Sequence, residues 1–201
     1  MDSSAAILLR RTKLSETSFI ITWLTADHGL VKTVAKGARR PKSPFAGRLD
    51  LFFEADIQFV RSRRSELHAL HELMLGSTHD ALRRSYLRLE LAAHFVELIE
   101  LTSVADHPIP EVFDLLRRAL RFLDSQEPSR RALLHFEREL ARVLGLIDDT
   151  HRAPIQAIAR LTHRLPTSRA DLLKRLRAKD PPRSVPAVSA GSPPPPPLDP
   201  A

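Results

Sequence analysis

The chain has 201 residues, of which 43% are hydrophobic and 27% charged, a size and composition typical of one or two soluble globular domains. It contains no cysteine, which excludes disulfide scaffolds, thiolate zinc sites and cysteine nucleophiles. The net charge of +7 is unevenly distributed, because residues 1–80 carry +3, residues 81–149 carry −2 and residues 150–201 carry +6. This distribution favours a polyanionic partner such as nucleic acid.

No membrane segment is predicted. Outside the proline-rich end, the longest uncharged run is the ten residues 17–26, whereas a bilayer span needs about 20 predominantly apolar residues. The N-terminus carries Asp2 and only five small or apolar residues before Arg10, which is unlike a signal peptide. We therefore expect a cytoplasmic protein.

Five short segments rich in Ile, Val, Phe and Thr are predicted to be strands, and they cover residues 5–11, 17–25, 30–36, 51–60 and 66–75. Gly29 fits a tight turn between the second and the third, because it tolerates a positive φ. Five strands in about 70 residues are too few for a sandwich and fit a small closed barrel. The five-stranded OB-fold matches in count and size, although an SH3-like barrel has a similar strand count.

After Gly76 the hydrophobic period changes from 2 to 3.6, which predicts a helical bundle. The first helix is expected to be capped by Thr78 or Asp80, to end near Thr102 and to carry His94 on its polar stripe.

Four further helices are expected. The second begins after residues 107–110, and the third has Pro128 in its first turn and Gly145 near its end. Two weaker helices are predicted at 154–164 and 168–178.

The predicted organisation is α+β in three parts. An OB-fold nucleic-acid-binding domain covers residues 1–76 and a helical domain covers residues 77–180. Residues 181–201 contain nine of the sixteen prolines and no apolar periodicity, so this tail is expected to be disordered.

The segment from residue 32 to residue 48 carries six cations and no acid. Its glycines and prolines prevent its second half from continuing as a strand, so it is predicted to be a basic loop. A solvated loop would tolerate six unpaired cations. Because like charges repel unless an anion is bound, we favour binding to nucleic-acid phosphates. The predicted binding residues are Lys32, Lys36, Arg39, Arg40, Lys42 and Arg48.

Two aromatic residues lie close to this segment in the sequence. Phe45 within it and Trp23 in the adjacent hairpin are suited to stacking on unpaired bases, but each also fits a core position, which we favour for Trp23.

A second basic cluster lies in the last two predicted helices. It fits a binding surface for another strand and a solvated helical face equally well. Its members are Arg160, Arg164, Arg169, Lys174, Arg175, Arg177 and Lys179.

No catalytic or metal-binding pattern is present. The chain lacks a Walker loop, a GxGxxG fingerprint and a GxSxG elbow. His68 and His71 are three residues apart on a predicted strand and therefore point to opposite faces. We expect neither an enzyme nor a cofactor nor a metal site.

Several motifs together resemble the RecO family of bacterial recombination mediators. In the N-terminal part these are Glu16-Thr17-Ser18, Leu24-Thr25, His28-Gly29-Leu30 and the segment Lys36-Gly37-Ala38-Arg39-Arg40-Pro41-Lys42-Ser43. In the helical part they are Tyr86, Glu97-Leu98, Pro108, Pro110, Phe113, Leu115-Leu116 and residues 136–145. The resemblance covers residues 5 to about 147 and is weak thereafter.

The resemblance implies an OB-fold followed by a helical domain in a nucleoid-associated protein that binds single- and double-stranded DNA. It further implies annealing of complementary strands, and partnership with RecR and with the tail of the single-stranded DNA-binding protein, to help load RecA. Many relatives carry a four-cysteine zinc cluster after the segment similar to residues 136–145. Here Asp148-Asp149-Thr150 leads into cysteine-free sequence, so zinc is not expected.

Two other functions fit the residues. A basic OB-fold also suits an RNA-binding factor associated with the ribosome or tRNA. The barrel could instead bind another protein chain as a non-enzymatic adaptor, which predicts little salt dependence.

Overall fold

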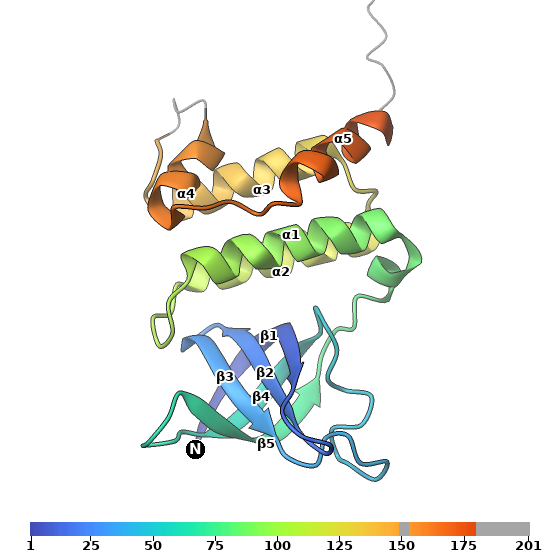
Figure 1. Cartoon of the computed structure of the whole chain (residues 1–201), viewed down its shortest axis with the longest axis vertical. Helices are drawn as coiled ribbons and strands as arrows, with labels where there is room; N and C mark the ends of the chain where they lie inside the picture. The colour runs from blue at the N-terminus through green and yellow to red at the C-terminus, as the bar shows by residue number, and fades with distance from the viewer. Residues whose placement is uncertain (149–152, 180–201) are drawn as a thin grey trace, which may run out of the picture.

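The computed structural model of the protein describes residues 1–148 and 153–179 (Figure 1). It shows a five-stranded barrel with a layered set of helices packed against its side wall. Within these residues, no helix combines the length and the apolar character needed to cross a bilayer. The proline-rich segment 181–201, for which disorder is predicted, lies outside the described residues.

All five predicted strands are confirmed. They are β1 (Asp2–Lys13), β2 (Phe19–Thr25), β3 (Gly29–Ala35), β4 (Glu54–Val60) and β5 (Leu67–Leu75). The fourth begins three residues later than predicted, because the chain is still turning at Phe52, which has a positive φ of 70°. The main-chain N–H of Phe52 donates to the carbonyl of Leu8 over 2.9 Å, so this turn is tied to β1.

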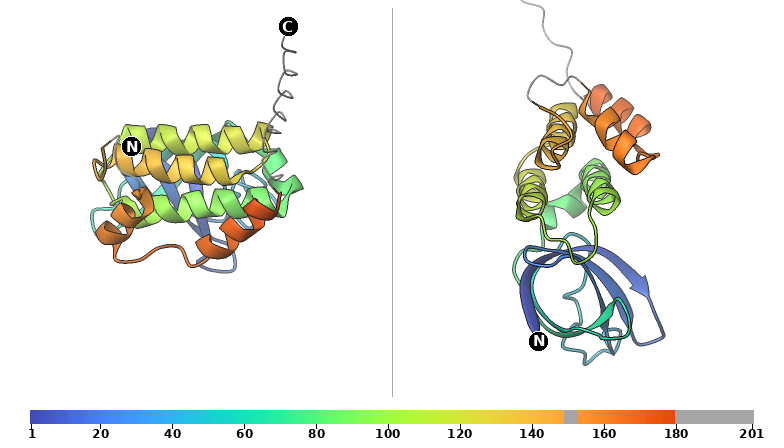
Figure 2. Two further views of the ribbon diagram at one scale, coloured as in Figure 1. Left: turned by 90° about the horizontal axis from the view of Figure 1, so that it is seen from above. Right: turned by 90° about the vertical axis from the view of Figure 1, so that its left-hand side faces the viewer.

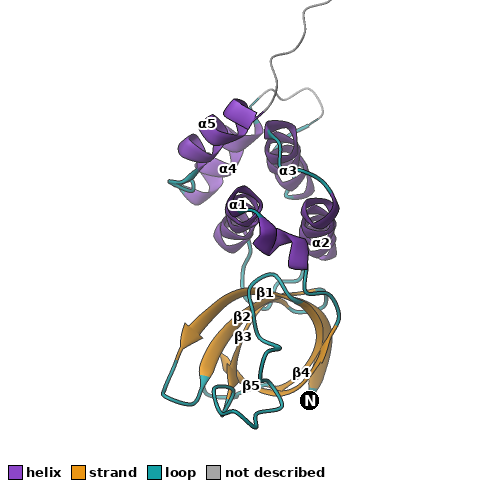
Figure 3. Ribbon diagram, turned by 90° about the vertical axis from the view of Figure 1, so that its right-hand side faces the viewer, coloured by secondary structure: helices purple, strands orange, loops and turns teal. Residues whose placement is uncertain are grey.

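The strands close into a barrel in the order β1-β2-β3-β5-β4 (Figure 3). Every pairing is antiparallel except that of β3 with β5. This Greek-key closure is the OB-fold arrangement, which rules out the SH3-like alternative.

The barrel interior is filled by alternate residues of the strands and by the segment that follows β3. Trp23 is completely buried, and its indole N–H donates to the Thr33 hydroxyl over 2.8 Å. Phe45 is 7% exposed and packs into the same apolar cluster. Both aromatic residues are therefore core residues, and neither is available for stacking on a base.

The helical part contains the five predicted helices and one short 3-10 turn (Figure 2). They are η1 (Asp80–Arg84), α1 (Tyr86–Thr102), α2 (Pro110–Ser125), α3 (Arg130–Val143), α4 (Pro154–Thr162) and α5 (Arg169–Lys179).

The predicted start of the first helix is wrong. The turn η1 is held separately, because the Ala81 N–H donates to the Asp124 carboxylate of α2 over 2.9 Å. Ser85 then has extended backbone, so α1 begins at Tyr86 and neither Thr78 nor Asp80 caps it.

Two other details of the helices differ from the prediction. Pro128 precedes α3 instead of lying in its first turn, because the Ser129 hydroxyl caps the helix by accepting from the Ala132 N–H over 3.2 Å. His94 is not on a solvated stripe; it is buried, with Nε2 3.2 Å from Glu137 Oε1.

The barrel and the helices share one apolar cluster, to which the barrel contributes Ile7, Leu9, Leu24 and Phe52. Ion pairs surround this contact. Arg10 is 2.6 Å from Glu100, Arg61 is 2.6 Å from Asp106, Arg83 is 2.8 Å from Asp50 and Arg121 is 3.3 Å from Glu54. A domain boundary at residues 76–77 stays a prediction.

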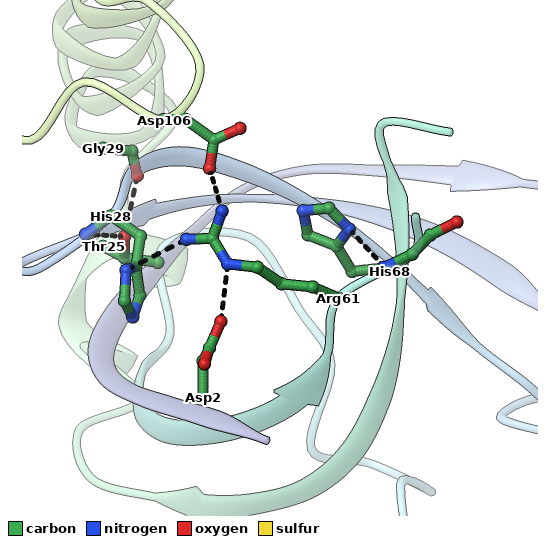
Figure 4. A network of polar contacts seen from close by, with 8 residues as sticks. Asp2, Thr25, His28, Gly29, Arg61, His68 and Asp106 are labelled. Carbon is green, nitrogen blue, oxygen red and sulfur yellow. Dashed lines mark hydrogen bonds and ion pairs between the residues drawn. The ribbon is translucent and has the colours of Figure 1, made fainter. Parts of the chain in front are cut away.

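Figure 4 shows the Arg61 contact closely. The guanidinium joins Asp2 of β1, His28 of the β2–β3 turn and Asp106 of the α1–α2 loop, at 2.5, 3.2 and 2.6 Å. Three segments that are distant in the sequence are thereby fixed to one another.

Candidate nucleic-acid interface

The predicted basic loop is an ordered segment, residues 36–53, which we call the β3–β4 loop. It crosses one end of the barrel (Figure 3). It is a series of tight turns in which, for example, the Arg40 N–H donates to the Gly37 carbonyl over 3.0 Å. Ala38, Phe45 and Leu49 anchor it in the barrel core. Its cations are therefore displayed from a fixed backbone.

The six predicted binding residues are all exposed, but they differ in their partners. Lys32 lies on the outer face of β3, with Nζ 3.8 Å from Glu66 Oε2. Arg39 lies 3.7 Å from Glu16. Four make no ion pair with any residue in the described part of the chain, and these are Lys36, Arg40, Lys42 and Arg48.

Arg39 holds the β3–β4 loop against the β1–β2 hairpin. Its N–H donates to the Thr17 carbonyl over 3.0 Å and its side chain to the Ser15 carbonyl over 3.0 Å. Its guanidinium also lies 5.7 Å from the centre of the Phe19 ring. These contacts give Arg39 a positioning role in addition to its charge.

Arg48 is placed on a different surface from Arg39. Together with Pro44 it lines a groove of about 440 Å³ over the outer side of β4 and β5, whose other walls include Asp56, His71 and Met74. The structure thus brings Arg39 close to the β1–β2 hairpin and places Arg48 beside β5.

Sequence reasoning missed three cations of the barrel. Arg11 of β1 lies 5.2 Å from the Phe19 ring centre and donates to the Leu49 carbonyl over 2.6 Å. Arg63 and Arg64 occupy the β4–β5 turn, where both are exposed and form no ion pair with a described residue. The adjacent arginines were a usable signal, since the β4–β5 loop of an OB-fold commonly contacts oligonucleotides.

The second basic cluster is only partly available to a ligand. Arg169 donates to both carboxylate oxygens of the buried Glu137, over 2.6 and 2.7 Å, and so fixes α5 to α3. Arg175 pairs with Glu90 of α1, and Lys174 with Asp171 over 3.2 Å. Arg160, Arg164 and Arg177 are exposed and form no ion pair with the residues described.

The two histidines of β5 lie on opposite sides of the sheet, as predicted. His68 is buried and stacks on Phe59 with 5.6 Å between ring centres, whereas His71 is exposed. Across residues 1–148 and 153–179, no group of three or more acidic or histidine side chains is arranged to hold a metal ion.

The helical part contains an apolar pocket of about 550 Å³ between α1, α2 and α3. Its floor includes Phe95 and Phe136, which stack with 4.0 Å between ring centres, and Phe122 at its edge is 42% exposed. The pocket walls also carry Arg118 and Arg131. The pocket therefore combines an apolar floor with cations.

Comparison with known proteins covers both parts of the chain. Residues 1–78 match the family model described as "Recombination protein O N terminal", and residues 83–153 match "Recombination protein O C terminal". The chain belongs to the RecO family of DNA repair proteins. The resemblance seen in the sequence is thereby confirmed.

Curated relatives named "DNA repair protein RecO" match over the same region. The one from Rhodopirellula baltica is 35% identical over 150 residues, covering 75% of this chain and 56% of the relative. That from Synechococcus elongatus is 35% identical over 124 residues, covering 62% and 46%, and that from Idiomarina loihiensis 34% identical over 146 residues, covering 73% and 62%. This RecO chain thus spans about half the length of the curated relatives it matches.

Proposed function

We propose that this RecO chain binds single- and double-stranded DNA, anneals complementary strands and helps to load a recombinase onto protein-coated single strands. The observation that carries the proposal is the set of free cations on an ordered loop of an OB-fold. Lys36, Arg40 and Lys42 are exposed without an ionic partner among the described residues, while Arg39 fixes the loop that bears them.

Such cations recognise the sugar–phosphate backbone and not the base sequence, since each neutralised phosphate releases condensed counterions. Sequence-independent binding suits repair, where a damaged site lies anywhere in the genome. Annealing then requires no covalent catalysis, only that two polyanions are held together with lowered repulsion until they pair. DNA binding of this kind would place the protein at the nucleoid.

The proposal includes RecR and the tail of the single-stranded DNA-binding protein as partners, with RecA loaded indirectly. The pocket between α1, α2 and α3 supports the second partner. Its apolar floor suits a buried apolar side chain and its exposed Arg131 suits an acidic peptide, while Arg118 is paired with Asp114 over 2.9 Å. We therefore assign the tail of the single-stranded DNA-binding protein to this pocket.

The test is a salt titration of oligonucleotide binding by the variant Arg40→Ala/Lys42→Ala. Neither side chain makes an ion pair within residues 1–148 and 153–179, so the fold should be unaffected. Losing two phosphate contacts should reduce the salt slope by about 1.4 on single strands. The matched control is Arg84→Ala/Arg130→Ala, which removes the same charge from exposed positions outside the barrel. Equal slopes for the two variants would contradict the assignment of the loop.

Strand annealing and competition by RNA complete the test. The Arg40→Ala/Lys42→Ala variant should anneal complementary oligonucleotides more slowly than the control variant at the same salt concentration. Displacement of DNA by a lower concentration of RNA of the same sequence would favour an RNA-binding factor instead.

A further inference from the structure

The last residues of β1 form a strand edge that has no neighbour. Strand β4 pairs with residues 2–7 of β1, and the Leu8 N–H then donates to the Phe53 carbonyl over 2.9 Å. Beyond this point β1 continues to Lys13 beside β2 alone, as Figure 2 shows for its dark-blue end. On the side away from β2, no main-chain hydrogen bond joins residues 10–13 to any described residue. We call residues 10–13 the β1 edge.

The two sides of the β1 edge face different parts of the molecule. The pairing with β2 shifts register at Leu9, which is buried against the helices. The Arg10 guanidinium also lies on the helical side, 2.6 Å from Glu100 of α1. The Arg11 side chain lies on the other side, where it donates to the Leu49 carbonyl of the β3–β4 loop over 2.6 Å. A strand paired with this edge would therefore present alternate side chains to α1 and to the β3–β4 loop.

A groove of about 890 Å³ lies beside the β1 edge, between the barrel and α1. Val96 and Leu101 of α1 and Leu165 of the α4–α5 loop supply apolar contacts in it. Ala93 of α1 lies in the same wall and is exposed, so the groove is open to solvent there. A strand added to the β1 edge would rest the side chains of one face on this apolar surface.

The charges in the walls of the groove leave an excess of cations. Arg10 and Glu100 neutralise each other through two hydrogen bonds of 3.0 and 2.6 Å. Arg164 is exposed and forms no ion pair with a described residue, and Arg11 has a carboxylate only at 3.7 Å. On the wall of α1, Glu97 is the acid that remains. This excess favours a ligand that carries acidic groups.

The β1 edge selects a polypeptide as the ligand. An unpaired edge offers both N–H donors and C=O acceptors, which an extended main chain satisfies. A phosphodiester only accepts hydrogen bonds and would satisfy half of these groups. A second copy of this chain is disfavoured at the same edge, because Arg10, Arg11 and Lys13 of the two copies would face one another.

We propose that the β1 edge and the groove beside it dock an extended acidic peptide of another protein, which adds a strand to the barrel sheet. The peptide alternates apolar side chains, which face Val96 and Leu101, with acidic side chains, which face Arg11. Arg164 adds positive charge across the groove. Four paired residues span about 13 Å, so a short segment is enough. This interaction goes beyond the proposed function, since it needs no nucleic acid.

The pattern of the peptide is tested by fluorescence polarisation with a labelled heptapeptide of alternating valine and aspartate, blocked at both ends. The control has the same composition, with all the valines before the aspartates. We expect the alternating peptide to bind about tenfold more tightly, the combined effect of about four facing pairs. Equal affinities, or no binding of either peptide at up to about 1 mM, would overturn the docking site.

Main-chain pairing is tested with two N-methylated versions of the alternating heptapeptide. One version carries N-methyl groups on the valine amides and the other on the aspartate amides. Because the N–H groups of successive residues point to opposite edges of a strand, only one set faces the β1 edge. One version should therefore lose binding while the other keeps it. Equal affinities of the two versions, whether kept or lost, would overturn the added strand.

The groove is tested with the variant Ala93→Trp. The indole would occupy the groove at an exposed helical position, where tryptophan costs the helix little, so the fold should be kept. We expect the alternating heptapeptide to bind at least about tenfold more weakly, because its apolar face loses its contact surface. The matched control is Ala178→Trp, which adds the same side chain to an exposed position of α5 outside the groove wall. Equal affinities of the two variants would overturn the placement in the groove.

Competition with an oligothymidylate separates this site from a nucleic-acid site. The oligonucleotide should bind Ala93→Trp as it binds wild type, and Arg40→Ala/Lys42→Ala should bind the heptapeptide as wild type does. If Ala93→Trp weakens the oligonucleotide and the oligonucleotide displaces the heptapeptide, the groove binds nucleic acid and the peptide proposal is wrong. If wild type binds the heptapeptide but ignores oligonucleotides even at low salt, the proposed function fails and the docking site stands.

Discussion

Glu137 of α3 is the only acidic residue that is buried among the residues described. Burial alone raises the pKa of its carboxyl group. The hydrogen bonds and charges of Arg169 and His94 lower the pKa by more than burial raises it, so the pKa lies below its ordinary value of 4.5. The ionised carboxylate therefore joins three helices, since His94 belongs to α1 and Arg169 to α5.

Replacing this carboxylate should loosen α5. Glu137→Gln leaves the partly buried Arg169 without its counter-charge, and we expect it to lower the free energy of unfolding by about 3 kcal/mol. The control Asp171→Asn breaks an exposed pair with Lys174 in the same helix and should cost less than about 1 kcal/mol. Urea unfolding monitored by circular dichroism measures both. Equal losses would contradict the role of Glu137.

The same pair predicts a pH dependence. A carboxyl group whose pKa is lowered by folding stabilises the folded state above its unfolded pKa, and this contribution disappears as the pH falls through the folded pKa. The advantage of wild type over Glu137→Gln should therefore be complete above about pH 4.5 and vanish on further acidification. Urea titrations at several pH values test this. A stability advantage of wild type that grows on acidification would contradict the lowered pKa of Glu137.

At the scale of elements, the β2–β3 turn and the α1–α2 loop touch through backbone. Gly29 has a φ of +66°, and a Cβ atom placed there would lie 2.5 Å from the carbonyl oxygen of His107. Ala105 also forms an isolated bridge with Gly29. The glycine is thus needed for two reasons, its conformation and the close approach.

Substitution at two glycines separates these reasons. Gly47→Ala meets a φ of +72° but no atom within 4 Å, so it should cost only about 1–2 kcal/mol for the left-handed conformation. Gly29→Ala adds the clash with His107 and should cost about 1–3 kcal/mol more. Thermal unfolding compares the two variants. If they lose the same stability, the approach of the α1–α2 loop is not a constraint.

Elements with strong periodicity were predictable, and features set by distant partners were not. The alternation of residues between two faces predicted both β2 and β3. The prolines at 108 and 110 predicted the start of α2. The separate turn η1 could not be predicted from the sequence, because the carboxylate that accepts from the Ala81 N–H belongs to Asp124, more than forty residues away. For the same reason the sequence showed six cations without an acid, whereas the fold brings Glu16 to Arg39 and Glu66 to Lys32.

At the scale of the whole molecule, the barrel and the helices are joined by an apolar centre and an exposed rim of charges. Phe52 belongs to the β3–β4 loop but is buried in the cluster formed with α1 and α2. The rim pairs include Arg10 with Glu100, where the arginine side chain is 64% exposed. Exposed pairs contribute little, so the apolar centre should provide most of the coupling between the two parts.

This coupling is measurable because Trp23, the single tryptophan, lies in the barrel, whereas far-UV circular dichroism is dominated by the helices. Wild type should give coincident urea midpoints by both probes. Phe52→Ala leaves a cavity at the contact, should cost about 3–5 kcal/mol and should separate the two midpoints. Arg10→Ala removes only a rim pair and should keep them together. Separate midpoints already in wild type would mean that the barrel and the helices unfold independently, and that the apolar centre does not couple their stabilities.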